Sequence, residues 1–230
     1  MFFDPVYLLF LAPGLVLTLY ATIKVKGTFA RYRDVPTASG RTGAEVAQEL
    51  LRRNNVRGVR VEPHEGFLSD HYDPKDKVVR LSPDVYYGRS ISAVGVAAHE
   101  CGHALQDAQG YAPMAIRQNL VVPANFGSTL SMVLIVAGFL LHATKLVWLG
   151  IFAFSAVVLF QLVTLPVEFN ASSRARLRLV ADGLVSREEE TQVGKVLNAA
   201  ALTYVAALIT SVLTLAYYIL RATGSSSSDD

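Results

Sequence analysis

The chain has 230 residues, of which 52% are hydrophobic and 17% are charged, and its mean hydropathy is +0.35. This is more apolar than is usual for a soluble domain of this length. The formal net charge is only +2, and no basic stripe with interleaved aromatic residues is present, so a nucleic-acid partner is not expected. A single cysteine excludes a disulfide framework within the chain.

Four apolar stretches are long enough to cross a bilayer core, which takes about 20 helical residues. They are residues 6–23, 123–142, 146–166 and 199–220. The first stretch is followed, not preceded, by basic residues, which is typical of an anchor with an external N-terminus and not of a cleaved signal peptide. We therefore expect a mainly α integral membrane protein with four transmembrane helices.

The basic residues are concentrated in two polar segments. Of the 21 Lys and Arg residues, 14 lie in residues 24–118 and another 5 lie in residues 167–197. Four spans place both segments on the same side of the membrane, and the positive-inside rule makes that side the cytoplasm. Both termini are then expected outside, in a bacterial-type plasma membrane.

The polar segments carry local signals for a small α+β domain. A capping box at Thr42 begins a helix that is expected to end near Asn54. Residues 59–62 alternate like a short strand, and residues 77–81 are expected to form a second strand after a turn. Ser186 begins another capping box, whose helix is expected to continue into the last span.

The most informative motif is an HExxH sequence at residues 99–103, on a helix expected to run from residue 90 or 92 to about residue 108. His99 and His103 are one helical turn apart and project from the same face. Two imidazoles at that spacing can bind one Zn²⁺ ion. Glu100 can reach a zinc-bound water and act as its general base.

A catalytic zinc usually has three protein ligands and one open position. We expect Glu168 to be the third ligand, because the hairpin of the second and third spans returns it to the face where the HExxH helix lies. A carboxylate at that depth is costly unless it is paired or binds a metal. Two alternatives stay open. Glu168 could instead pair with Arg174 or Arg176, and His64 or His71 could be the third ligand.

Two other residues of the motif have simpler interpretations. Cys101 points away from both histidines on a helix, so we expect it to pack as a small hydrophobic residue, not to act as a nucleophile or ligand. Gly102 costs helix propensity. It is expected where backbone or substrate must pass close to the helix.

The chain resembles the YugP-type family of membrane zinc metallopeptidases and, more distantly, the HtpX-like and Ste24-like gluzincins. The similarity lies mainly in residues 94–106 (VGVAAHECGHALQ) and 165–175 (LPVEFNASSRA), with shorter matches at residues 71–74 and 78–82. The resemblance covers most of the chain, and the two long motifs are specific when they occur together.

This resemblance implies zinc bound by His99, His103 and Glu168, and peptide-bond hydrolysis through a zinc-activated water with Glu100 as the general base. HtpX-like relatives usually carry Asp four residues after the ligand Glu, where this chain has Ser172. The departure leaves open which side chain supports the metal ligands, and such supporting groups affect metal affinity.

The prediction is thus a membrane zinc endopeptidase with a small α+β, gluzincin-like cytoplasmic domain that carries the HExxH helix. The expected segments are an N-terminal anchor (1–23), a cytoplasmic metalloprotease region (24–118), a transmembrane hairpin (119–166), a cytoplasmic segment with the third ligand (167–198), a C-terminal transmembrane helix (199–221) and a disordered tail (222–230).

The expected partners are membrane lipid and a protein or peptide substrate in or near the membrane. Binding of another membrane protein or of a second copy of the chain stays open. In related folds the edge of a strand holds an extended substrate, and residues 77–81 or 59–62 are candidates for it. The alternative function is a membrane scaffold with a structural or vestigial zinc site. A transporter is disfavoured, because the spans carry almost no charge at mid-depth.

Overall fold

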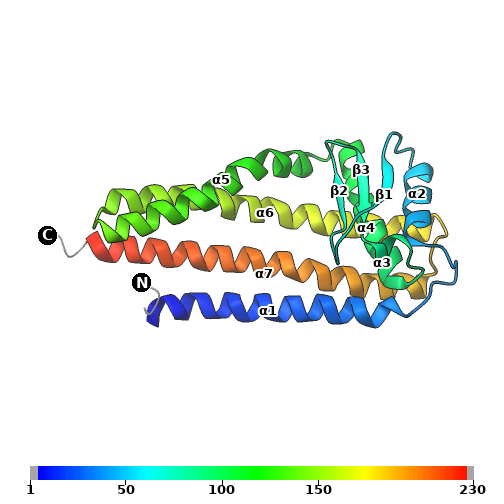
Figure 1. Cartoon of the computed structure of the whole chain (residues 1–230), viewed down its shortest axis with the longest axis horizontal. Helices are drawn as coiled ribbons and strands as arrows, with labels where there is room; N and C mark the ends of the chain where they lie inside the picture. The colour runs from blue at the N-terminus through cyan, green and yellow to red at the C-terminus, as the bar shows by residue number, and fades with distance from the viewer. Residues whose placement is uncertain (1–4, 227–230) are drawn as a thin grey trace. The chain divides into compact units, whose positions relative to one another are not determined.

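The computed structural model describes residues 5–226, which divide into two compact units. The first unit takes its described residues from 1–20, 115–166 and 203–230, and the second consists of residues 21–114 and 167–202. The elements in chain order (Figure 1) are α1 (Pro5–Arg33), α2 (Gly43–Arg53), β1 (Arg60–Pro63), β2 (His71–Asp73), β3 (Val78–Leu81), α3 (Pro83–Tyr86), α4 (Ile91–Ala108), α5 (Ala112–Leu140), α6 (Thr144–Ala181) and α7 (Arg187–Ser226).

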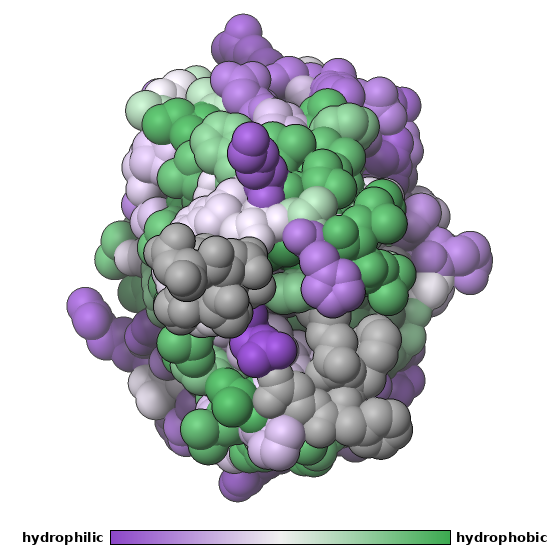
Figure 2. All heavy atoms as spheres, turned by 90° about the vertical axis from the view of Figure 1, so that its left-hand side faces the viewer, coloured by the Kyte–Doolittle hydropathy of each residue, from purple (hydrophilic) through white to green (hydrophobic). Residues whose placement is uncertain are grey.

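The first unit is made of parts of four helices. Within residues 5–226, α1, α5, α6 and α7 are long and apolar enough to cross a membrane by length and composition. The prediction of four such helices is confirmed. Large apolar side chains of this unit lie at its surface, and Leu9, Leu140 and Phe152 are 71%, 74% and 77% exposed. Figure 2 shows apolar side chains among polar ones over the face that it presents.

The second unit contains a three-stranded sheet in the order β1-β3-β2. β1 pairs with β3 in parallel, and β2 pairs with β3 in antiparallel register. The predicted strand at residues 77–81 is therefore the central strand, and the prediction that its edge holds a substrate is wrong, because both of its edges are already paired. β2 was not predicted as a strand and forms one edge of the sheet.

Local capping signals set the helix ends of the second unit. The Thr42 side chain accepts from the backbone N–H of residue 45 in a complete capping box, and α2 ends at Asn54 as predicted. Ser90 caps α4, whose observed end also matches the prediction. Ser186 and Glu189 form the second predicted capping box, and α7 then runs without interruption to Ser226.

The last segment of the chain differs in part from the prediction of a disordered tail at residues 222–230. Residues 222–226 belong to α7. Residues 227–230 lie outside the described part of the chain.

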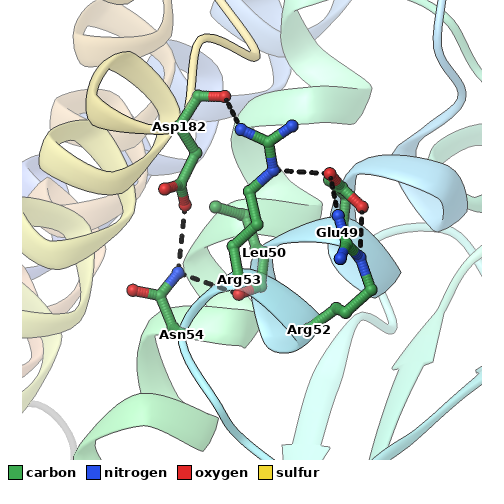
Figure 3. Close-up of polar contacts among 6 residues, drawn as sticks. All are labelled: Glu49, Leu50, Arg52, Arg53, Asn54 and Asp182. Atoms are coloured by element: carbon green, nitrogen blue, oxygen red, sulfur yellow. Dashed lines mark hydrogen bonds and ion pairs between the residues drawn. The ribbon is translucent and has the colours of Figure 1, made fainter.

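Polar contacts join α2 to the turn between α6 and α7 within the second unit (Figure 3). The Arg53 guanidinium donates to the backbone carbonyl of Asp182 at 2.7 Å. The Asn54 amide donates to the Asp182 carboxylate at 3.0 Å and to the Leu50 carbonyl at 2.8 Å. These contacts connect two stretches of chain that are more than 120 residues apart in sequence.

Helix α4 lies at the centre of the second unit, and 14 of its 18 residues are buried. Its partners in the core come from every neighbouring element, and the buried side chains around it include Val46, Leu50, Val79, Leu81, Val167, Leu179, Val193 and Leu197. A helix held on so many sides fixes the direction of each side chain that it carries.

Candidate metal centre

His99 and His103 lie on one face of α4, as their spacing predicts. Their rings meet edge to face with centroids 4.8 Å apart. The regular helix that presents them begins at Ser90, whose side chain accepts from the backbone N–H of Ala93. The two imidazoles are therefore positioned by the rigid backbone of a buried helix.

Glu168 reaches these imidazoles from α6. Its Oε2 atom lies 3.1 Å from Nε2 of His99 and 3.4 Å from Nε2 of His103. Glu168 is only 1% exposed. Within residues 5–226, the group of residues that could hold a metal ion consists of these three, whose ligand atoms lie within 4.8 Å of one another.

The donor set fits zinc. It offers two imidazole nitrogens and one carboxylate oxygen, which are the ligand types of catalytic zinc sites with one open position. Both imidazoles turn the same nitrogen, Nε2, toward the carboxylate. A cation bound there would also compensate a carboxylate that is almost completely buried.

The alternatives that the sequence left open are placed elsewhere. The Arg176 guanidinium pairs with Glu190 at 2.5 Å, and Nε of Arg174 donates to Asn170 at 2.6 Å. The rings of His64 and His71 meet edge to face, with centroids 5.3 Å apart. Among the described residues, neither of these histidines belongs to the group that could hold a metal.

The carboxyl of Glu168 is held in its charged form. Burial acts to raise the pKa of Glu168, but the contacts with His103 and His99 outweigh burial and hold that pKa well below its usual range. A deprotonated carboxylate is the form that binds a metal ion.

Glu100 is buried beside these three residues. Burial raises the pKa of Glu100 to about 7, the charge of His99 lowers it, and the charges of Glu168 and Asp70 raise it further. The backbone N–H of Tyr72 on β2 donates to the Glu100 carboxylate. The edge strand β2 therefore lies directly against the carboxylate that follows the first histidine.

Two side chains hold the far nitrogens of the imidazoles. Nδ1 of His99 lies 3.1 Å from the Ser172 hydroxyl, and Nδ1 of His103 lies 3.0 Å from Oε1 of Gln106. Ser172, four residues after Glu168, is therefore in contact with a histidine of the HExxH motif. Sequence analysis did not identify Gln106, although its place one turn after His103 on the same helix is a usable signal.

The other two residues of the motif have the structural environments predicted for them. The Cys101 thiol is buried, its Sγ lies 3.6 Å from the Ala47 carbonyl, and burial raises the pKa of this thiol. Gly102 lies against α6, where a Cβ atom would be 2.5 Å from the Ala171 carbonyl oxygen. The predicted close approach is therefore made by backbone.

The comparisons with known proteins agree with this donor set. Over residues 7–223 the chain matches the family described as "Putative neutral zinc metallopeptidase", and it belongs to that family. The predicted resemblance and the predicted zinc cofactor are both confirmed at this level.

The chain is also similar to a protein of Bacillus subtilis (strain 168) that is named "Putative membrane protease YugP". The two are 50% identical over 207 residues, which cover 90% of this chain and 92% of that protein. No solved structure matches the chain.

Proposed function

We propose that this chain is an integral membrane zinc endopeptidase, in which His99, His103 and Glu168 hold the zinc and Glu100 is the general base. The observation that carries the proposal is the position of Glu168 Oε2, 3.1 Å and 3.4 Å from the two Nε2 atoms. Glu168 is 65 residues beyond the HExxH motif in sequence, so only the fold brings these groups together.

Zinc, when bound, supplies Lewis acidity that activates water and polarises a carbonyl group. The chain supplies the proton transfers. The Glu100 carboxylate takes a proton from the attacking water and passes it to the leaving amine. Burial raises the pKa of Glu100, which makes this carboxylate a stronger proton acceptor than an exposed one.

The substrate is proposed to be an extended protein or peptide segment that lies along β2. This strand is an edge of the sheet, and its Tyr72 N–H already donates to Glu100. An edge strand binds an extended chain through main-chain hydrogen bonds. Of the two edges that the sheet offers, β2 is the one for which a contact with a residue of the HExxH motif is seen.

The site is proposed to face the cytoplasm, with both termini on the opposite side of the membrane. The support is the distribution of basic residues, because 19 of the 21 Lys and Arg residues lie in the segments 24–118 and 167–197. The substrates are then membrane proteins or proteins near the cytoplasmic face of the membrane.

The alternative is a membrane scaffold in which zinc has a structural role. Glu100 argues against it, since a structural zinc site is closed by four ligands and needs no buried carboxylate beside them. The two functions differ in what they predict for Glu100→Gln, which should lose peptide cleavage only if the chain is an endopeptidase.

The test is zinc content and peptide cleavage of the full chain in detergent, for wild type, Glu168→Ala and Glu100→Gln. The exposed Glu188 of α7 offers a matched control, Glu188→Gln. We expect about one zinc per chain in wild type, Glu100→Gln and Glu188→Gln, and much less in Glu168→Ala. Cleavage of a peptide library should be lost in Glu100→Gln and kept in Glu188→Gln. Undiminished cleavage by Glu100→Gln would refute its role, and zinc without any cleavage in wild type would favour the scaffold.

A further inference from the structure

The orientation of the Gln106 amide is fixed by its neighbours on α6. Gln106 is completely buried, and its Nε2 atom donates to the Val167 carbonyl at 2.8 Å and to Oδ1 of Asn170 at 3.0 Å. A backbone carbonyl can only accept hydrogen bonds. The NH₂ group of Gln106 must therefore face α6, and its Oε1 must face Nδ1 of His103, 3.0 Å away.

The orientation of the Asn170 amide is fixed in the same way. Nε of Arg174 donates to Oδ1 of Asn170 at 2.6 Å, and a guanidinium has no acceptor atom. Arg174 is itself held by Gln109 and by the ring of Tyr111, whose centroid is 5.5 Å from the guanidinium carbon. Gln106 and Asn170 thus each contact a group that can only accept or only donate, and this contact fixes which end of the amide faces it.

The consequence for His103 is a proton on Nδ1. Oε1 of Gln106 can only accept, so the contact at 3.0 Å requires Nδ1 to donate. Nε2 faces the Glu168 carboxylate at 3.4 Å and is then the nitrogen that can bind a metal ion in place of its own proton. The Ser172 hydroxyl beside His99 differs, because a hydroxyl can donate or accept and imposes no tautomer.

We propose that Gln106 is a positioning residue that keeps the proton of His103 on Nδ1 and ties this imidazole to the backbone just before Glu168. The Gln106 amide thereby contacts both His103 on α4 and the turn of α6 that carries Glu168. The inference rests on the proposed zinc site, and it assigns a support for His103 at a position outside the five residues of HExxH. Groups that hold the second nitrogen of a histidine ligand typically affect metal affinity by 10–100-fold.

The first measurement is the protonation of Nδ1 of His103, read by NMR from the ¹⁵N shifts of histidine in the metal-free full chain at pH 8. The signal is assigned by its loss in His103→Asn. We expect a protonated Nδ1 in wild type and an unprotonated Nδ1 in Gln106→Met, which keeps an unbranched side chain but removes the acceptor. The matched control is Gln192→Met, because Gln192 lies in the same unit and its buried Oε1 has no hydrogen-bond partner among the described residues.

The second measurement is zinc affinity by competition with a chromogenic chelator. We expect zinc to bind about 10–100-fold more weakly to Gln106→Met than to wild type or Gln192→Met. If Gln106→Met does not fold, Gln106→Glu keeps the acceptor for His103 and the side-chain volume, although it loses the donations to Val167 and Asn170. Nδ1 should stay protonated in that variant, and an unprotonated Nδ1 would overturn the inference.

The two readouts separate failure of this inference from failure of the proposed zinc site. An unprotonated Nδ1 in wild type, or equal zinc affinities of wild type and Gln106→Met, would overturn the role of Gln106 while the zinc site stands. A protonated Nδ1 that Gln106→Met loses, in a chain that binds no zinc, would support the hydrogen bond and overturn the zinc site.

Discussion

Substitution of Gly102 tests the close packing of α4 against α6 beside the candidate metal centre. A Cβ atom at this position would lie 2.5 Å from the Ala171 carbonyl oxygen, 3.0 Å from its carbonyl carbon and 3.1 Å from its Cα. Ordinary contacts between such atoms are about 3.5 Å or longer. The Gly102→Ala variant therefore requires α4 and α6 to separate locally by about 1 Å, and backbone cannot rotate away as a side chain can.

Two other glycines in helices of the second unit give a graded comparison. A Cβ atom at Gly95 would lie 3.3 Å from Cγ1 of Val193, which is a side-chain atom that can shift. A Cβ atom at Gly27 would meet nothing within 4 Å. Since Ala is favoured over Gly in a helix by about 1 kcal/mol, Gly27→Ala should raise the free energy of unfolding by about this amount.

The expected cost of Gly102→Ala is the difference between two terms. Overpacking a well-packed interior costs about 1–3 kcal/mol, and the gain in helix propensity offsets about 1 kcal/mol of it. Because the contact is with backbone, we expect a cost in the upper part of the overpacking range, a net loss of about 1–2 kcal/mol, and a decrease in the melting temperature of roughly 2–8 °C. Gly95→Ala should lie near zero, because its two terms are of similar size.

The assay uses the only thiol of the chain as its reporter. The Cys101 side chain is completely buried, so a maleimide dye that fluoresces on reaction should report unfolding as the protein is heated in detergent. Gly102→Ala should also bind zinc more weakly, because separation of α4 and α6 moves His103 away from Glu168. A Gly102→Ala variant that melts at or above the wild-type temperature, while Gly27→Ala melts higher than wild type, would refute the reasoning.

Two further predictions concern pH and topology. Burial raises the pKa of Asp70 above its ordinary value of 3.8, although Ser82 donates to its carboxyl group. The protonated carboxyl therefore stabilises the fold below pH 3.8, and this stabilisation is lost as the pH rises through the pKa of the folded state. Asp70→Asn should therefore gain stability relative to wild type as the pH rises from about 4 to 7, and a pH-independent difference in melting temperature would contradict this. For topology, Ser226→Cys should react with an impermeant thiol reagent in intact cells and Lys75→Cys only after lysis, with the wild-type chain, whose single Cys101 is buried, as the control. Reaction of Ser226→Cys only after lysis would overturn the proposed orientation.

The features that the sequence predicted correctly depend on residues close together in the chain. The capping boxes at Thr42 and Ser186 need only a hydroxyl and a glutamate three residues later, and both are present in the structure. The two histidines of the HExxH motif need only helical periodicity to share a face. The four apolar helices are recognisable by length and composition alone.

The features that were missed depend on contacts between separate elements, some close in the chain and some far apart. β2 has only three residues and is followed by the Asp73-Pro74 turn, so its strand conformation comes from pairing with β3. The place of β3 at the centre of the sheet follows from two partners on different sides, which alternation along one strand cannot show. The place of Gln106 one turn after His103 is visible in the sequence, but the orientation of its amide depends on the Val167 carbonyl 61 residues away.

The position of Glu168 depends on both local sequence context and contacts between elements. Its sequence context showed a carboxylate in apolar surroundings, which is costly without a partner. The structure places that carboxylate against two imidazoles whose spacing was predictable by itself. A buried charge is stable only when it is compensated, so a metal ion bound to the folded state stabilises the packing of α4 against α6. This stabilisation grows with the logarithm of the ratio of the metal concentration to its dissociation constant. The contacts that hold these two helices together, from the Gly102 approach to the Gln106 amide, are therefore expected to set zinc affinity as well as stability.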